Sequence, residues 1–238
     1  MLKKIKHFAQ IFLSISGYRP EHASLPRTIA MAASIGFTLY LSSRRKKNLN
    51  HALSYYAVST AGYVGFILFT LPQNGFRTTL IERFGEKNGF RIYEAILAFL
   101  FFHNGSSIGY VSAASANTLG RTGQSRIIAP AAIGLLIAGF VTKIWAARVV
   151  GIDIYYWKDM FLGRKITDFV VSGPYKLLSN PMYGAGQLQS YGFALLHRSA
   201  PGLIISAINQ CAVFSFYFLA ERKFIEQTYL DTPSNSTI

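Results

Sequence analysis

Long uncharged stretches alternate with short polar ones along this chain. Each uncharged stretch is near the roughly 20 residues that a helix needs to cross a bilayer. Glycine, alanine and serine are frequent inside them, and such small residues let membrane helices pack closely. The pattern therefore predicts membrane helices at 52–71, 95–120, 127–142, 177–196 and 199–220, with a marginal sixth at 28–43.

We expect an all-α fold, a polytopic integral membrane helical bundle with a C-terminal helical hairpin. The arm of that hairpin over 185–197 has room for only about 20 Å of helix, so it can enter the membrane without crossing it. We expect an interfacial N-terminal segment over 1–27, followed by transmembrane helices over 28–149, at about 28–43, 52–72, 93–115 and 127–149. A core follows over 150–230, and it contains an elbow at 173–186, a hairpin at 185–220 and an exit helix. The last residues, 231–238, are expected to form a flexible tail.

Composition supports a membrane protein. Hydrophobic residues make up 51% of the chain and charged residues only 14%, whereas soluble domains carry about 25% charge. A soluble helical protein would have too little polar surface to cover its core. The net charge of +14 also suggests nucleic acid, but membrane topology explains it better.

Most basic residues fall in the segments on one side of the predicted spans. The positive-inside rule then places both termini in the cytosol, facing anionic lipid headgroups. The cluster Arg44–Lys47 lies on the other side and disagrees, unless 28–43 does not fully span.

A segment rich in glycine, proline and tyrosine, from Gly173 to Gly186, leads from a polar loop into the last two uncharged stretches. Pro174 and Pro181 each disfavour helix at the preceding residue, so this elbow should be ordered and partly non-helical. A carboxylate, Glu221, ends the last uncharged stretch. An elbow of this kind beside a carboxylate can hold a polar cofactor at the lipid boundary.

Three patterns occur in order: G-P-Y-x-x-L-x-N-P-M-Y-x-x-G over 173–186, then G-x-A-L-L-H-x-S-x-x-G-L, then L-x-E-x-x-F-x-x-x-x-Y. Together, over roughly 170–229, they resemble the phosphatidylethanolamine N-methyltransferase family of membrane methyltransferases. That family shares a core with isoprenylcysteine carboxyl methyltransferases. The first two-thirds of the chain matches only in hydropathy.

The resemblance implies an S-adenosylmethionine-dependent enzyme with its cofactor pocket on the cytosolic side, which N-methylates phosphatidylethanolamine or its methylated derivatives. Pro181 and Tyr183 match the family's elbow, and Asn180 matches its phospholipid branch. Glu221 matches the first of two adjacent acidic residues, but Arg222 stands at the second. Family habit implies the endoplasmic reticulum membrane.

The residues can be assigned chemistry in their own right. Glu221 can pair with the ammonium group of the cofactor, and Tyr175 and Tyr183 can stack on its adenine or lie near its sulfonium. Gly184 and Gly186 permit close approach of the cofactor to the backbone, and exposed N–H groups at the elbow can bind the cofactor's carboxylate. The alternatives are a surface ion pair for Glu221, interfacial anchoring for the tyrosines and helix packing for the glycines.

Methylation needs a neutral amine, so some group must accept a proton. His103 is a candidate because ionisable residues inside spans are functional candidates by default, although a histidine bonded to a neighbouring helix is an equally good reading. Asp153, Glu226 and Asp159 are further candidates. No zinc spacing, phosphate loop or serine triad occurs, so no metal is expected.

Two other readings stay open. The same fold can act on another lipophilic acceptor, such as a prenylcysteine carboxylate, or reduce a sterol with NADPH. A non-catalytic lipid-binding protein is the third reading, supported by Arg222 in place of an acidic residue. A reductase should show extra basic residues placed for the phosphate of its nicotinamide cofactor.

Overall fold

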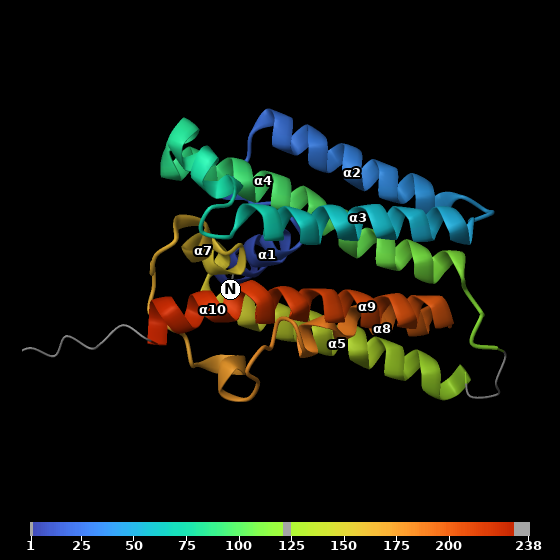
Figure 1. Cartoon of the computed structure of the whole chain (residues 1–238). Helices are drawn as coiled ribbons and strands as arrows, with labels where there is room; N and C mark the ends of the chain where they lie inside the picture. The colour runs from blue at the N-terminus through green and yellow to red at the C-terminus, as the bar shows by residue number, and fades with distance from the viewer. Residues whose placement is uncertain (1, 121–124, 231–238) are drawn as a thin grey trace, which may run out of the picture.

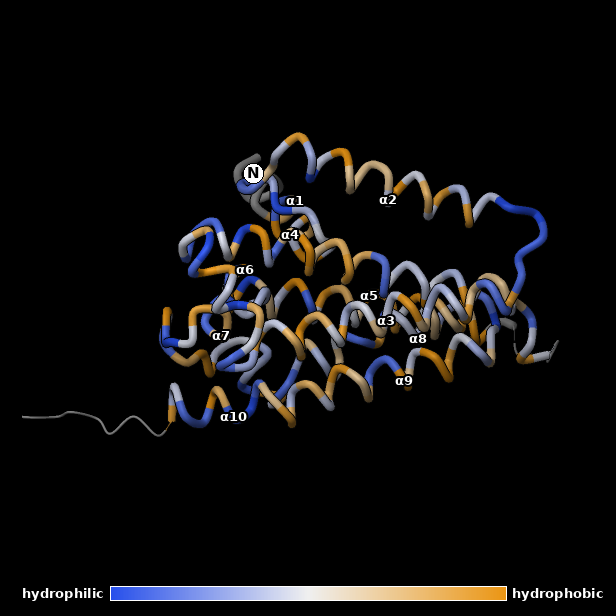
Figure 2. Tube along the Cα trace, turned by 45° about the horizontal axis from the view of Figure 1, so that its top comes forward, coloured by the Kyte–Doolittle hydropathy of each residue, from blue (hydrophilic) through white to orange (hydrophobic). Residues whose placement is uncertain are grey.

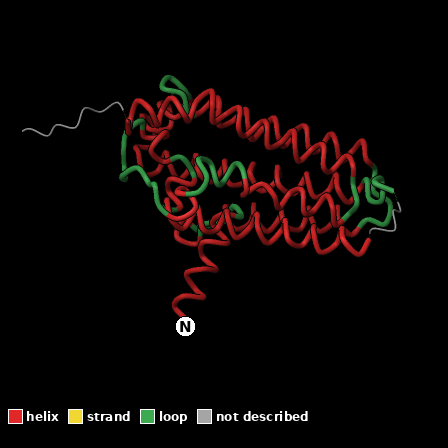
Figure 3. Tube along the Cα trace, turned by 90° about the horizontal axis from the view of Figure 1, so that it is seen from below, coloured by secondary structure: helices red, strands yellow, loops and turns green. Residues whose placement is uncertain are grey.

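The computed structural model describes residues 2–120 and 125–230, and the predicted tail 231–238 lies outside them. This part of the chain is helical and contains no strand (Figure 3). The all-α prediction is confirmed. The helices are α1 (Leu2–Ile15), α2 (Leu25–Ser43), α3 (Leu49–Thr70), α4 (Phe76–Ala114), α5 (Ser125–Val150), α6 (Ile152–Tyr155), α7 (Lys158–Leu162), α8 (Leu188–Leu196), α9 (Ala200–Phe216) and α10 (Arg222–Ile225).

Four helices in the described ranges are long and apolar enough to cross a membrane. They are Leu49–Thr70, Phe76–Ala114, Ile127–Val150 and Ala200–Leu230, the last continuing α9 through α10 by way of π-helical turns at Tyr217–Glu221 and Glu226–Leu230. α2 is not among them, in keeping with the marginal character of 28–43. α8 has nine residues, about 14 Å of helix, which is shorter than a bilayer crossing needs and in keeping with the short arm expected over 185–197.

The long helices run side by side and their connections gather at two ends (Figure 1). The α2–α3 and α8–α9 connections lie at one end. The turn before α4, the short helices α6 and α7, and α10 lie at the other end, which matches the grouping that the basic residues predicted. Figure 2 shows apolar residues along α2, which stands apart from the other long helices in that view.

α4 begins earlier than the sequence suggested. The polar residues 73–92 were expected to form a loop, but α4 starts at Phe76. Gly85 turns the helix, with φ of 72° and ψ of 162°, a conformation open to glycine and strained for other residues. The polar residues on either side of it can remain helical because this end of the bundle projects beyond the apolar part.

α5 and α8 pack closely at Gly139. A Cβ there would lie 2.3 Å from the backbone nitrogen of Gln189, so only glycine allows this distance between the two helices. Gly134, one turn earlier on α5, would place a Cβ in open space. The pairing of α5 with α8 sets the position of the elbow, because the elbow leads directly into α8.

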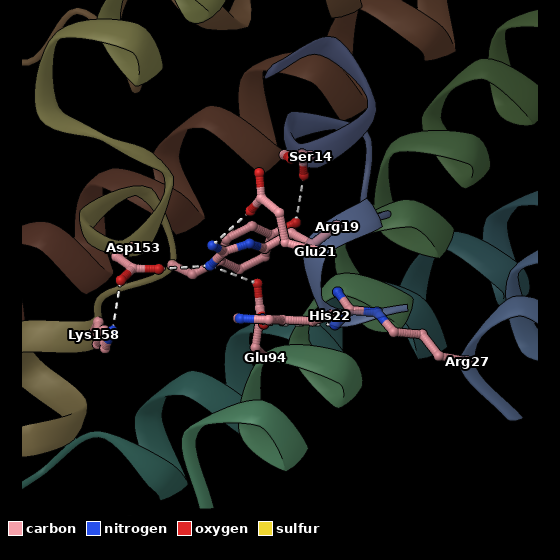
Figure 4. A network of polar contacts seen from close by, with 9 residues as sticks. Ser14, Arg19, Glu21, His22, Arg27, Glu94, Asp153 and Lys158 are labelled. Atoms are coloured by element: carbon pink, nitrogen blue, oxygen red, sulfur yellow. Dashed lines mark hydrogen bonds and ion pairs between the residues drawn. The ribbon is translucent and has the colours of Figure 1, made fainter. Parts of the chain in front are cut away.

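The N-terminal segment is anchored by buried charges (Figure 4). Glu94 of α4 is fully buried and forms ion pairs with Arg19 (3.1 Å), His22 (2.5 Å) and Arg27 (3.5 Å). Tyr156 donates a hydrogen bond to the carbonyl of Ser14 at 2.6 Å. The segment predicted as interfacial is thus fixed to α4 and α6 by specific contacts.

Candidate functional site

A cavity of about 370 Å³ lies at the end of the bundle that holds the elbow. This volume falls within the range of small-molecule sites, about 300–1,000 Å³. Its walls come from α6 and α7, the segment 167–171, the elbow, and the helix from 217 to 230. The lining residues that matter below are Trp157, Asp159, Asp168, Tyr175, Asn180, Pro181, Tyr183, Tyr217, Glu221, Arg222, Glu226 and Tyr229.

The elbow and the last helix meet in this cavity. The hydroxyl of Tyr183 donates a hydrogen bond to Oε2 of Glu221 at 2.5 Å. The side-chain amide of Gln210 on α9 donates to the carbonyl of Tyr183 at 3.0 Å, which fixes the elbow against the same helix. Residues 38 apart in the chain are therefore held at one wall. Glu221 ends a π-helical turn, a feature that is frequent at functional sites.

The cavity wall is acidic. Asp159, Asp168, Glu221 and Glu226 line it, and Arg222 is the one basic residue among the described lining residues. Arg222 is already paired with Glu226 at 2.8 Å. A wall of this charge favours a cationic ligand over an anionic one.

Two further groups show that the cavity is built for polar contacts. The hydroxyl of Tyr175 is buried and has no hydrogen-bond partner among the described residues. Asp159 is buried beneath the cavity, and it accepts hydrogen bonds from the Met160 N–H at 2.8 Å and from the Tyr229 hydroxyl at 2.9 Å. Buried polar groups normally find partners, so the hydroxyl of Tyr175 is available to a ligand atom in the cavity.

Burial raises the pKa of the Asp159 carboxyl above the ordinary range of an aspartate, although these hydrogen bonds oppose the shift. The folded protein therefore holds this proton more tightly than the unfolded chain. The resulting stabilisation is fully present below the ordinary aspartate pKa and is lost as the pH rises through the raised value.

We therefore predict that Asp159→Asn becomes more stable relative to wild type as the pH rises. The unfolding temperature of both proteins in detergent, measured between about pH 4 and pH 8, checks this. The difference between the two unfolding temperatures should change steadily over the lower part of this pH range. Parallel curves would contradict the raised pKa.

The structure brings together most of the predicted site residues. Tyr175, Asn180, Pro181, Tyr183, Glu221 and Glu226 all line the cavity. Gly184 and Gly186 do not line it. Their N–H groups donate to the carbonyls of Asn180 (2.8 Å) and Pro181 (2.7 Å) inside the elbow. The turn itself uses these two amides, so they are not the exposed N–H groups that the elbow was expected to offer to a ligand.

His103 lies away from the cavity, in α4. Its Nδ1 is 2.7 Å from the Tyr55 hydroxyl of α3, and its Nε2 is 3.0 Å from the Ser34 hydroxyl of α2. These contacts join three helices. They match the alternative reading of a histidine bonded to neighbouring helices.

Asp153 also lies outside this cavity, in a neighbouring groove (Figure 4). It pairs with Arg19 at 2.6 Å and with Lys158 at 2.5 Å. Burial opposes ionisation, but the hydrogen bonds from Lys158 and Arg19 outweigh it and lower the pKa of Asp153. A carboxylate held ionised between two cations is a weak proton acceptor.

Sequence reasoning missed several lining residues. Trp157 was not among the predicted site residues, but it lines the cavity in a left-handed conformation with φ of 53°. A bulky residue with positive φ is uncommon and often marks a functional site. Asp159 was considered, but no sequence signal set it apart from Asp153, since only the fold decides which carboxylate is buried.

The part of the chain that is similar to known proteins is also the part that forms the cavity. Residues 127–232 match the family model described as phospholipid methyltransferase. The family resemblance is confirmed over this part of the chain. All the lining residues of the cavity fall inside this phospholipid methyltransferase region (127–232), and α1 to α4 fall outside it.

Curated relatives carry the name phosphatidylethanolamine N-methyltransferase. The protein from Clavispora lusitaniae is 29% identical over 106 residues, 44% of this chain and 12% of the relative. The Schizosaccharomyces pombe protein is 34% identical over 97 residues, 41% of this chain and 11% of the relative. The Aspergillus oryzae protein is 34% identical over 106 residues, 44% of this chain and 11% of the relative. The chain thus spans about a tenth of the length of these relatives, and no solved structure matches it.

Proposed function

We propose that the chain is an S-adenosylmethionine-dependent methyltransferase that N-methylates phosphatidylethanolamine or its methylated derivatives. The observation that carries the proposal is the hydrogen bond between Tyr183 of the elbow and Glu221, within an acidic cavity inside the phospholipid methyltransferase region. The names of the relatives support the acceptor.

The cavity suits this cofactor. S-adenosylmethionine, when bound, supplies an electrophilic methyl group on a positively charged sulfur. Glu221 offers a carboxylate to the cofactor's ammonium group, and the hydroxyl of Tyr175 offers an unused donor. Tyr183 and Tyr217 line the same cavity, where their aromatic rings would stabilise the cationic centre of the cofactor.

The chain's own contribution to the reaction is positioning and proton removal. The amine of the acceptor must lose a proton before it is methylated, and a carboxylate with a raised pKa accepts it best. Asp159 has this property and lines the cavity, and Glu226 is the second carboxylate in reach. We assign the proton to one of these two, and not to His103 or Asp153.

The charge of the cavity argues against the NADPH-dependent reductase. Such an enzyme needs basic groups for the phosphates of its cofactor, and Arg222, the one basic residue that lines the described part of the cavity, is paired with Glu226. Arg222 therefore does not leave an excess positive charge in the pocket, and the case for a non-catalytic protein is weakened.

We place the protein in the endoplasmic reticulum membrane with both termini in the cytosol. The basic residues support this orientation through the positive-inside rule. The cavity lies at the end of the bundle that would then face the cytosol.

Methyl transfer to lipid tests the proposal. Purified protein in mixed micelles should transfer labelled methyl from S-adenosylmethionine to phosphatidylethanolamine or to its mono- or dimethyl derivative, and should not oxidise NADPH. Absence of labelled lipid with all three acceptors, together with absence of S-adenosylmethionine binding, would overturn it.

A further inference from the structure

A lysine is buried inside the membrane-spanning part of α5. Lys143 is only 5% exposed, and it forms no ion pair with any described residue. Its ammonium group lies 5.2 Å from the centre of the Phe101 ring. A cation–π contact is weaker than the hydration that a buried ammonium group loses, so the lysine lacks a full partner.

Lys143 faces a second, small cavity of about 30 Å³. No carboxylate lines this space in the described structure. Its polar side chains are tyrosines, Trp157 and Gln187, the last of these directly after the elbow and 8% exposed. A cation and an amide donor around a space without acidic groups form a site for an oxyanion.

The small cavity adjoins the acidic one. Trp157, Met182 and Tyr183 line both, and the hydroxyl of Tyr183 is bonded to Glu221 in the larger cavity. Lys143 lies seven residues before Val150, which lines the larger cavity, so it is about 10 Å deeper along α5. A basic site thus lies deeper in the bundle, next to an acidic site near its end.

We propose that Lys143, with Gln187, binds the phosphodiester of the lipid acceptor and so selects phospholipid amines over amines without phosphate. The inference rests on the proposed methyltransferase function. A lipid headgroup of this class carries an anionic phosphate and an amine two carbons apart. Phosphate at Lys143 therefore directs the amine towards the neighbouring acidic cavity. The small space admits the free oxygens of a phosphodiester and excludes a nucleotide.

Replacement of the charge by a side chain of similar length tests the proposal. For Lys143→Met, the ratio of methylation of phosphatidylethanolamine to that of sphingosine, a lipid amine without phosphate, should fall about tenfold or more, through a higher KM for the phospholipid. S-adenosylmethionine binding, measured by calorimetry, should stay within about twofold. Lys46→Met, at an exposed position at the other end of the bundle, should change neither quantity.

The outcomes separate cleanly. An unchanged ratio of the two methylation rates would overturn the proposal. If S-adenosylmethionine binding were also weaker, the anion bound at Lys143 would be the carboxylate of the cofactor and not the phosphate of the lipid. Wild-type protein that methylates neither phosphatidylethanolamine nor its mono- and dimethyl derivatives, and does not bind S-adenosylmethionine, would refute the proposed function, and this inference with it.

A measurement on the wild type covers the case in which Lys143→Met does not fold. Reductive methylation of Lys143 by formaldehyde and cyanoborohydride, mapped by mass spectrometry, should be slowed by short-chain phosphatidylcholine, which has the phosphodiester but no reactive amine, and not by short-chain diacylglycerol. Equal labelling with both lipids would overturn the proposal.

Discussion

Glu221→Gln is expected to weaken S-adenosylmethionine binding by about 100-fold or more and to lower methyl transfer at least as much. Glutamine keeps the size of the side chain and loses the negative charge. The carboxylate accepts the hydrogen bond of Tyr183 and faces the cavity, so its charge is the feature that a cationic ligand would sense. Calorimetry for binding and labelled methyl for transfer measure the two effects separately.

Glu82→Gln is the matched control for this variant. Glu82 is exposed on α4, far from the cavity lining, so the same chemical change there should leave binding and transfer unchanged. If Glu221→Gln bound the cofactor as wild type does, the assignment of the cofactor to this cavity would be wrong.

Gly139→Ala is expected to lower the free energy of unfolding by about 1–3 kcal/mol or more. The added methyl group would stand 2.3 Å from the backbone of Gln189, and neither helix can move without shifting the elbow. The unfolding temperature in detergent should fall, and methyl transfer should fall with it.

Gly134→Ala is the matched control on the same helix. Its methyl group enters open space, and alanine is the better helix former, so stability should be unchanged or slightly raised. Equal unfolding temperatures for the two variants would show that α5 and α8 do not pack as described.

Much of the fold could be predicted because charge patterning reports directly on membrane crossing. The uncharged stretch 52–71 predicts α3. The short arm expected over 185–197 predicts a short helix, and α8 is nine residues long. The helical start of α4 could not be predicted in this way. Its residues 76–92 are polar, and a polar helix that projects beyond the apolar part has the same composition as a loop.

The site was predicted in part. The proline-bounded elbow and Glu221 stood out because they carry a family pattern, and the structure joins them through Tyr183. Whether a backbone amide in the elbow is free depends on the turn geometry, which composition does not show. Lys143 lies inside the span predicted at 127–149 but was not singled out, because its burial depends on contacts with distant helices.

The most direct test is an experimental structure of the protein with bound S-adenosylhomocysteine, the demethylated cofactor. We predict that its amino group lies within hydrogen-bonding distance of Glu221, with its adenosine between the elbow and the helix from 217 to 230. A ligand bound elsewhere, with no contact to Glu221, would contradict the account.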